Sequence, residues 1–302
     1  MYSKLAGDFP GTFSIVARDA KSGEFGVAVQ SKFLAAAAVV PWARAGVGAI
    51  ATQARANYTF GPRGMTLLEQ GHDAEEVLAA LIREDENREV RQVAVLDRNG
   101  KAAAFTGKEC LYWAGHQLGE GFSCQGNILV GPEVVAAMAK AFQGTSGDLA
   151  MKLVAALHAG QAAGGDSRGQ QSAGLLVVRE GAGFGGLSDQ YINLRVDDHP
   201  QPIAELERLL DLHRLFFAAS HVEKDFPVKG EVRKGLAEML TGLGYLPHVH
   251  VIDGRLETAL ERLAEAEGLE VRAVPPGWIS GSLVAKLRER WMEKQQKVRS
   301  GK

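Results

Sequence analysis

The sequence predicts an α+β protein in which β-sheets pack together and are covered by helices, followed by a small α-rich domain. Alternating apolar segments come in hairpin-like pairs, amphipathic helices come in contiguous blocks between those pairs, and the composition changes near residue 225. Helix blocks between antiparallel pairs favour layered sheets. Most of the 36 glycines lie in the first two-thirds of the chain, where tight turns and close backbone approaches are therefore expected.

A first hairpin is predicted over residues 13–31. Phe13–Asp19 and Phe25–Ser31 both alternate between apolar and polar residues, and Gly23 lies in the short connection between them. If Asp19 pairs with Glu24, the antiparallel register places Thr12 opposite Ser31, with Lys32 adjoining. A slip of one residue would exchange the two faces of the strand.

The same periodicities predict the later elements. Alternation indicates strands, apolar residues three or four apart indicate helices, Gly-Pro marks two helix starts, and Asn99-Gly100 marks a hairpin turn. In chain order these elements are a buried strand over 45–53, a helix start at Gly61-Pro62, a helix over 73–84, a hairpin over 91–106, a helix start at Gly131-Pro132 with helical stripes over 134–157, strands over 172–179 and 191–196, and a long helix from Pro202 to about Ala219.

A domain boundary is predicted at residues 222–228. Past Asp225 the glycines thin out, and leucines recur at helical spacing through Leu236, Leu256 and Leu287. The prediction is one domain over 12–222 and a small helical domain over 228–302.

Composition excludes several classes of protein. The formal net charge of −2 provides no strong field for nucleic acid or an anionic membrane surface. The two cysteines form neither a disulfide framework nor a metal-type spacing, and no apolar run approaches the ~20 residues that span a bilayer. Residues 1–8 lack the apolar core of a secretory signal, so a cytoplasmic protein is expected.

The Gly11-Thr12 pair suggests a catalytic nucleophile at the start of the first strand. If the peptide bond before Thr12 is cut, one residue carries both a hydroxyl nucleophile and a free α-amine. Such an amine titrates near pH ~8 and therefore acts as a built-in general base. Threonine is also common at the start of strands because β-branched residues favour them, so the pair alone supports either interpretation.

Uncharged polar residues gather at predicted strand ends and loops, where amides and glycine backbone would suit an acyl-transfer site that donates hydrogen bonds to an oxyanion. The same residue types also make turns and caps, so the pattern leaves both roles open. The groups are Gln30-Ser31-Lys32, Thr52-Gln53 with Asn57, Gln125-Gly126-Asn127, and residues 164–172.

No cofactor or metal is expected. The glycines at 181–186 are followed by a predicted strand rather than the helix that a dinucleotide-binding motif requires. Asp197-Asp198-His199, with His248 and His250, lacks helical ligand spacing, and the two groups lie in different predicted domains.

Several segments together resemble the bacterial family catalogued as domain of unknown function 1028, in order from about residue 12 to about 215. The family is placed with the N-terminal nucleophile (Ntn) hydrolases, which implies a four-layer αββα sandwich, and residues from 228 resemble a peptidoglycan-binding-like helical domain. The matching segments are Thr-Phe-Ser-Ile-Val-Ala-Arg-Asp (12–19), Gly-Val-Ala-Val-Gln-Ser-Lys-Phe (26–33), Val-Pro-Trp-Ala-Arg-Ala-Gly-Val-Gly-Ala (40–49), Ala-Thr-Gln-Ala (51–54), Gln-Gly-Asn-Ile-Leu (125–129), Gly-Gly-Asp-Ser-Arg-Gly-Gln-Gln-Ser-Ala (164–173) and Leu-Arg-Val-Asp-Asp-His-Pro (194–200).

The resemblance implies roles for individual residues. Thr12 would be the nucleophile, and Ser31 and Lys32 would hold its hydroxyl and tune its amine. Asp166 and Arg168 would bind a charged end of the substrate, since arginine pairs with carboxylates through a planar fork. Ser14, on the same strand face as Thr12, is an alternative hydroxyl. The remaining substrate-binding candidates are Gln30, Gln53, Asn57, Gln125 and Asn127.

Two functions compete at this stage. The first is an amidohydrolase that cleaves an amide or small peptide with Thr12 after removal of residues 1–11. The second is a non-catalytic binding protein on the same scaffold, whose ligand would be a cell-wall or other small peptide. In either case the partner is a small molecule or peptide rather than nucleic acid or a membrane, and self-association into a homo-oligomer, or a lid role for the C-terminal domain, stays open.

Overall fold

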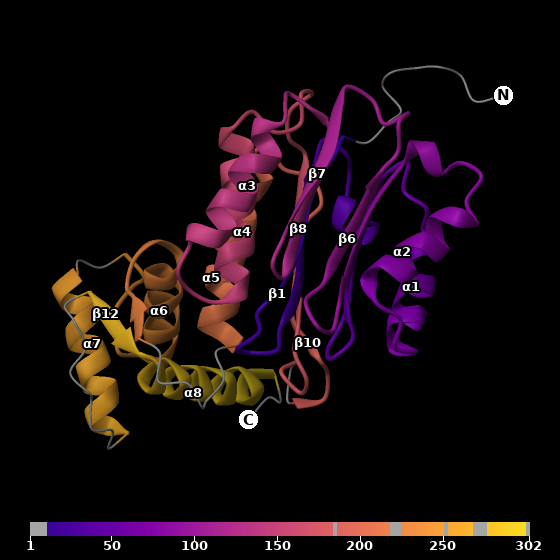
Figure 1. The fold of residues 1–302 in the computed structure, drawn as a ribbon. Coiled ribbons are helices and arrows are strands. Elements are labelled where there is room, and N and C mark those ends of the chain that lie inside the picture. Colours follow the sequence, from indigo (N-terminus) through magenta and orange to yellow (C-terminus); the bar gives the residue numbers. More distant parts are fainter. Residues whose placement is uncertain (1–10, 184–185, 218–224, 251–252, 268–276, 300–302) are drawn as a thin grey trace. The chain divides into compact units, whose positions relative to one another are not determined.

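A computed structural model describes residues 11–183, 186–217, 225–250, 253–267 and 277–299 (Figure 1). The chain divides into two compact units between Glu207 and Arg208, within helix α5 (Pro202–Phe217). Of the boundary predicted at 222–228, residues 222–224 lie outside the described ranges, and residues 225–228 belong to the second unit.

The first unit contains two antiparallel sheets. The larger sheet has the strand order β10-β9-β2-β1-β8-β7, and the smaller has the order β3-β4-β5-β6. The predicted α+β class is therefore confirmed. The strands are β1 (Thr12–Arg18), β2 (Phe25–Ser31), β3 (Pro41–Arg44), β4 (Gly48–Ala54), β5 (Arg91–Asp97), β6 (Ala102–Thr106), β7 (Trp113–Gly119), β8 (Phe122–Leu129), β9 (Ser172–Val178) and β10 (Gln190–Val196).

The two sheets face each other, and helices cover their outer faces (Figure 1). Small and β-branched side chains such as Val16, Val27 and Ala51 fill the space between the sheets. Helices α3 (Glu133–Gly144) and α4 (Leu149–Ala162) pack on the six-stranded sheet, whereas α1 (Phe60–Glu69) and α2 (Ala74–Arg83) pack on the four-stranded sheet. The order across the unit is thus helices, sheet, sheet, helices.

The register of the first hairpin is the one that its sequence predicts. Thr12 pairs with Ser31 on β2, and the amide of Asp19 donates to the carbonyl of Glu24 at the turn. On its other edge, β1 pairs with β8, which places Asn127 opposite Thr12. Thr12 therefore begins a central strand with a polar residue on each side.

Side chains alternate along β1, so one face of the strand contacts the four-stranded sheet and the other contacts the covering helices. Val16 belongs to the core between the sheets, so Thr12 and Ser14 point the same way, toward the four-stranded sheet. Phe13 points to the opposite face, where its ring lies beside Gly160 of α4. The two hydroxyls are thus enclosed between the two sheets, close to β4 and β5.

Three strands of the first unit were not predicted: β3, β7 and β8. Strand β8 is fully buried but carries Ser123, Gln125 and Asn127, and polar residues in a buried strand resemble a loop when only the sequence is seen. Strand β7 has no fully buried residue and shows little alternation. Local pattern fails here because hydrogen-bond partners from other strands satisfy the polar side chains of β8.

In its described residues, the second unit is a small helical domain with one strand pair. Helices α6 (Gly230–Leu243), α7 (Asp253–Ala266) and α8 (Gly281–Arg299) surround buried leucines that include Leu236, Leu256 and Leu287. Helices are present where the leucine spacing predicts them, but the pairing of β11 (Asp225–Pro227) with β12 (Trp278–Ser280) was not predicted. None of the helices in the described part of the chain is long and apolar enough to cross a membrane.

Gly174 of β9 is expected to be essential for the position of the short 3-10 turn at Ala36–Ala38. A Cβ atom at Gly174 would lie 2.2 Å from the Cβ of Ala37, and neither atom can rotate away. We expect Gly174→Ala to lower the free energy of unfolding by roughly 1–3 kcal/mol, measured by urea denaturation. Gly144→Ala is the control, because its Cβ would meet nothing outside its own helix within 4 Å. Equal stability of the two variants would contradict this packing.

Candidate active site

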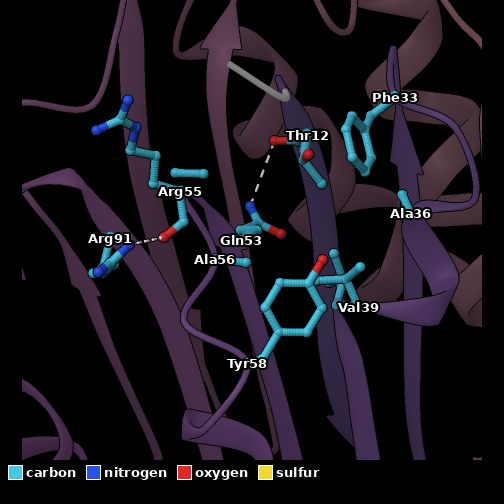
Figure 2. A pocket seen from close by; sticks show the side chains of 11 residues that line it. Thr12, Phe33, Ala36, Val39, Gln53, Arg55, Ala56, Tyr58 and Arg91 are labelled. Atoms are coloured by element: carbon cyan, nitrogen blue, oxygen red, sulfur yellow. Dashed lines mark hydrogen bonds between the residues drawn. The ribbon is translucent and has the colours of Figure 1, made fainter. Parts of the chain in front are cut away.

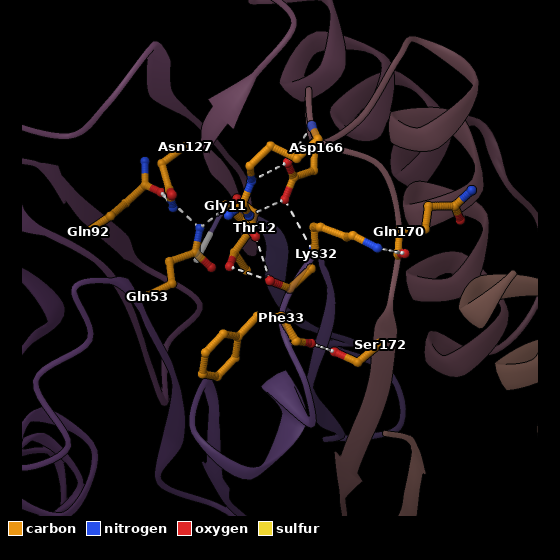
Figure 3. Close-up of polar contacts among 12 residues, drawn as sticks. Gly11, Thr12, Lys32, Phe33, Gln53, Gln92, Asn127, Asp166, Gln170 and Ser172 are labelled. Carbon is orange, nitrogen blue, oxygen red and sulfur yellow. Dashed lines mark hydrogen bonds and ion pairs between the residues drawn. The ribbon is translucent and has the colours of Figure 1, made fainter. Parts of the chain in front are cut away.

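A chain of hydrogen bonds joins Thr12 to the peptide bond that precedes it (Figure 3). The Ser31 hydroxyl donates to the carbonyl oxygen of Gly11, and Thr12 Oγ1 lies 3.0 Å from Ser31 Oγ. A serine hydroxyl has one proton, so the Thr12 hydroxyl is the donor to Ser31. Thr12 is only 2% exposed, and both hydroxyls are therefore held in one orientation. Ser31 thus contacts both the predicted nucleophile and the bond predicted to be cut.

The carboxylate of Asp166 organises the chain around Gly11. It accepts hydrogen bonds from the Lys32 amide at 3.1 Å, the Arg168 amide at 3.0 Å and Arg168 Nη2 at 2.8 Å. A Cβ atom at Gly11 would lie 2.6 Å from both Asp166 Oδ2 and Arg168 Nη2, so a larger residue would require these side chains to move. The ion pair of Asp166 with Arg168 therefore packs against Gly11, on one side of the Gly11–Thr12 bond that is predicted to be cleaved.

The side chain of Lys32 does not reach Thr12. Its ammonium group donates to the carbonyl of Gln170 at 3.2 Å, and Lys32 is exposed to solvent (Figure 3). Lys32 directly follows β2, so the direction of its side chain depends on its contact with the loop before β9 rather than on strand alternation. Only its backbone amide, which donates to Asp166, takes part in the geometry around Gly11.

Gln92, on β5, is the centre of an amide network that was not predicted. Its Oε1 accepts from Gln53 Nε2 at 2.8 Å and from Asn127 Nδ2 at 2.9 Å. Gln53 Nε2 also lies 3.4 Å from the carbonyl oxygen of Thr12. Gln92 Nε2 in turn donates to the carbonyl of Gly126 at 2.8 Å. The signal available in the sequence was a glutamine directly before the apolar residues of this strand. The fully buried amide of Gln92 orients the side-chain amides of Gln53 and Asn127, both predicted site residues, beside Thr12.

Ser14 of β1 and Gln125 of β8 extend this network of hydrogen bonds. The Ser14 hydroxyl donates to Gln53 Oε1 at 2.6 Å and accepts from Gln125 Nε2 at 2.7 Å, while Ser123 Oγ donates to Gln125 Oε1 at 2.8 Å. The side chains of Ser14, Ser123 and Gln125 are fully buried. The Ser14 hydroxyl, predicted as an alternative to that of Thr12, is thus buried and hydrogen-bonded to two amides.

The structure does not bring Gln30 or Asn57 to this group. Gln30 pairs with Phe13, so its side chain lies on the face of β2 opposite Ser31, where its amide atoms have no hydrogen-bond partner among the described residues. Asn57 instead donates to Asp85 at 2.9 Å and accepts from the Thr59 amide at 3.0 Å. Asn57 therefore shapes the loop before α1.

A cavity of about 320 Å³ opens beside Thr12 (Figure 2). Thr12 lies at one end and Tyr58 at the other, Gln53 lies between them, and Phe33 and Arg55 lie on opposite sides. Sequence analysis did not identify this apolar wall, because its residues come from two loops with no common motif. The lining residues are Thr12, Phe33, Ala36, Val39, Val40, Gln53, Ala54, Arg55, Ala56, Tyr58 and Arg91.

Left-handed backbone recurs around the cavity at residues that are not glycine. Ala35 has φ 52°, Ala54 has φ 62° and Ile128 has φ 55°. Each such residue costs of order 1–3 kcal/mol and persists only where the surroundings impose it. Ala54 lines the cavity and Ala35 precedes the lining residue Ala36, whereas Ile128 does not line the cavity but follows Asn127 of the amide network. Strain of this kind clusters at functional sites, which favours this location for the site.

A partly buried ion pair holds the loop that carries Arg55 and Tyr58. Arg91 Nε donates to Asp85 at 2.8 Å, and Arg91 Nη1 donates to the Arg55 carbonyl at 2.6 Å. Burial alone raises the pKa of the Asp85 carboxyl, but hydrogen bonds from Arg91, Asn57 and a backbone amide outweigh it and hold that pKa below its ordinary value. The pair is thus stable in its charged form, and it fixes one wall of the cavity.

Among the described residues, no group of three or more His, Cys, Asp or Glu side chains is arranged to hold a metal ion. The chemistry available around Thr12 comes from hydroxyls, amides and one ion pair.

We expect Asp85→Asn to destabilise the first unit, because Arg91 then keeps a buried charge without its carboxylate. The expected loss is about 2–4 kcal/mol at pH 7 in urea denaturation. The folded pKa is the lower one, so the stabilisation is complete above the unfolded pKa of ~3.9 and is lost as pH falls through the folded pKa. The gap between the two proteins should therefore close below about pH 4. A gap that is constant from pH 7 to pH 3 would contradict the ion-pair account.

Comparison with known proteins gives a family but no activity. A model described as "Family of unknown function (DUF1028)" matches residues 12–206. The solved structure of a protein from Silicibacter pomeroyi, described with the same family model, is similar with a TM-score of 0.62 and 30% sequence identity, over 68% of this chain and 89% of that chain. No curated protein matches. Since the family model covers more than half of the chain, the protein belongs to the DUF1028 family, a family of unknown function.

Proposed function

We propose that this protein is an amide hydrolase of the Ntn type, with Thr12 as its nucleophile after cleavage of the Gly11–Thr12 bond. The observation that carries the proposal is the chain of hydrogen bonds from Thr12 through Ser31 to the Gly11 carbonyl. The order of helices, sheet, sheet and helices is consistent with the αββα sandwich of Ntn hydrolases, and that fold assignment is part of the proposal.

The cleavage step uses groups already in contact. Thr12 Oγ1 attacks the carbonyl carbon of Gly11, its proton passes to Ser31 Oγ, and the Ser31 proton passes to the carbonyl oxygen. A neutral tetrahedral intermediate forms. Its C–N bond then breaks as the proton of the new hydroxyl moves to the Thr12 nitrogen, which leaves an ester between Gly11 and Thr12 Oγ1. The Thr12 α-amine is free once this bond has broken, and water then hydrolyses the ester, which frees the Thr12 hydroxyl and releases the segment that ends in the Gly11 carboxylate.

The freed residue then has the parts needed for hydrolysis of a second amide. The Thr12 amine, with a pKa near ~8, accepts the hydroxyl proton during attack on the substrate. Ser31 keeps its place beside the hydroxyl, and loss of Gly11 clears the space beside Asp166 and Arg168. The amides of Gln53 and Asn127, oriented by Gln92, are the candidates for holding the substrate carbonyl.

The remaining assignments are also part of the proposal. The substrate is a small amide or peptide, and the protein acts in the cytoplasm. Residues 228–302 are a peptidoglycan-binding-like helical domain by resemblance, so a peptide ligand would suit both parts of the chain.

Ser31→Ala should slow the cleavage before Thr12 without preventing folding. The variant loses the donor to the Gly11 carbonyl, and loss of one oxyanion donor typically slows a reaction by about 10²–10³-fold. Intact mass measured over time after synthesis gives the rate. Lys32→Gln is the matched control, since the Lys32 side chain points to Gln170, and it should cleave like the unaltered protein. Normal cleavage of Ser31→Ala, or equal slowing in both variants, would contradict the role of Ser31.

Thr12→Ala should show neither chain cleavage nor amide hydrolysis, and Thr12→Ser should retain both because it keeps the hydroxyl. To separate the two reactions, an external protease can release a chain that begins at residue 12. We expect the released chain with Thr12 to hydrolyse amides from an aminoacyl-anilide panel, and the chain released from the Thr12→Ala variant to be inactive. Equal hydrolysis by both chains would exclude Thr12 as the nucleophile.

A further inference from the structure

The cavity beside Thr12 has an apolar wall that stays in contact with water. Phe33, Val39 and Val40 line it, together with Tyr58 and three alanines. Phe33 is 41% exposed and Tyr58 is 60% exposed, so neither ring is buried in the core of the protein. Apolar surface gathered in this way favours a ligand that covers it.

The two arginines that line the cavity do not present their charge to its apolar wall. The guanidinium of Arg91 donates to Asp85 at 2.8 Å and 3.5 Å and to the Arg55 carbonyl at 2.6 Å. Figure 2 shows the guanidinium of Arg55 turned away from Thr12 and from the ring of Phe33. No acidic residue is among the described lining residues. A charged or strongly polar group placed against the apolar wall would therefore lose its water without gaining a partner.

The volume of the cavity matches one side chain and the amide attached to it. An engineered apolar cavity of about 150 Å³ binds benzene. The cavity beside Thr12 has about 320 Å³, so it has room for a side chain as large as that of phenylalanine and for a neighbouring amide. Its volume lies near the lower end of the range for small-molecule sites, and a larger ligand would extend beyond it.

The position of Thr12 at one end of the cavity decides which part of a substrate would occupy it (Figure 2). In the proposed hydrolysis, the acyl part of the substrate becomes an ester of Thr12 Oγ1, whereas the amine part leaves after the first step. A side chain on the acyl part therefore keeps its apolar contacts through both steps. Figure 2 shows the ring of Phe33 beside Thr12, where such a side chain would begin.

We propose that the cavity selects amides whose acyl part carries an uncharged, apolar side chain between leucine and phenylalanine in size. This side chain lies against Phe33, Val39 and Tyr58, and the carbonyl carbon lies at Thr12 Oγ1. The assignment names the substrate class of the proposed hydrolase, and it rests on that function only for the attack by Thr12.

The reaction of such an amide balances without a further reactant besides water. Attack by Thr12 Oγ1 forms the ester, and the hydroxyl proton passes through the Thr12 amine to the leaving nitrogen. Water then cleaves the ester: its oxygen and one proton stay on the released acid, and its other proton returns to Thr12 Oγ1.

Binding to the Thr12→Ala protein tests the selection separately from catalysis. The probes are four neutral N-acetyl amino acid N-methylamides, those of glycine, asparagine, leucine and phenylalanine, measured by NMR titration. The leucine and phenylalanine probes should bind at least about tenfold more tightly than the glycine probe, because the cavity buries their side chains. The asparagine probe has nearly the shape of the leucine probe, and it should bind at least about fivefold more weakly because its amide finds no partner at the apolar wall.

Two variants and a control, each added to Thr12→Ala, locate the side chain of the probe. Ala56 lines the cavity, so Ala56→Leu should fill part of it, weaken the phenylalanine probe at least about fivefold and leave the glycine probe unchanged. Phe33→Ala, a truncation at an exposed position, should weaken the leucine and phenylalanine probes about threefold or more and keeps the test available if Ala56→Leu does not fold. Tyr112→Ala removes an exposed ring that does not line the cavity and should leave the order of the probes unchanged.

Four results would overturn the inference: equal binding of the four probes, equal binding of the leucine and asparagine probes, an order that neither cavity variant alters, or no binding up to the solubility limit. The expected order, together with an unaltered protein that hydrolyses none of the aminoacyl-anilides, would keep the ligand class and reject the hydrolase. Anilide hydrolysis at rates that do not depend on the aminoacyl side chain would keep the hydrolase and reject the selection.

Discussion

Buried polar groups between two sheets must hydrogen-bond to one another, because an unpaired buried amide or hydroxyl lowers the stability of the fold by on the order of 1–3 kcal/mol. This constraint governs the end of the sheet interface that contains Thr12. Ser14, Gln53 and Gln92 come from both sheets and satisfy each other across the interface. The polar network therefore determines how β4 and β5 sit against β1 and β8, and with them the walls of the cavity.

The interface between the sheets has two chemically different parts. Away from Thr12, residues such as Val16 of β1, Val29 of β2 and Ala94 of β5 form an apolar core that stabilises the fold by burial. At the Thr12 end, amides and hydroxyls replace apolar side chains, and the cavity opens there. Because the rigid apolar part supports the polar part, the proposed nucleophile is held on a central strand rather than on a mobile loop, as precise positioning requires.

The sequence allowed prediction of those features that depend on local pattern. The hairpin register that pairs Thr12 with Ser31 follows from alternation and one turn, and it is confirmed. Gln92, the cavity and the strand β8 depend on contacts between distant segments, which alternation cannot reveal. Gln30 was grouped with Ser31 although neighbouring strand residues point to opposite faces. The direction of Lys32 depends on a contact 138 residues away.

The measurement that tests the central claim most directly is the N-terminal sequence and intact mass of the purified protein. Cleavage before Thr12 would yield a chain that begins at Thr12 with a free amine, as the contacts of Ser31 with Thr12 and Gly11 predict. A protein that keeps the Gly11–Thr12 bond after prolonged incubation would leave the Thr12 nitrogen as an amide without base function. That result would contradict Thr12 as an N-terminal nucleophile.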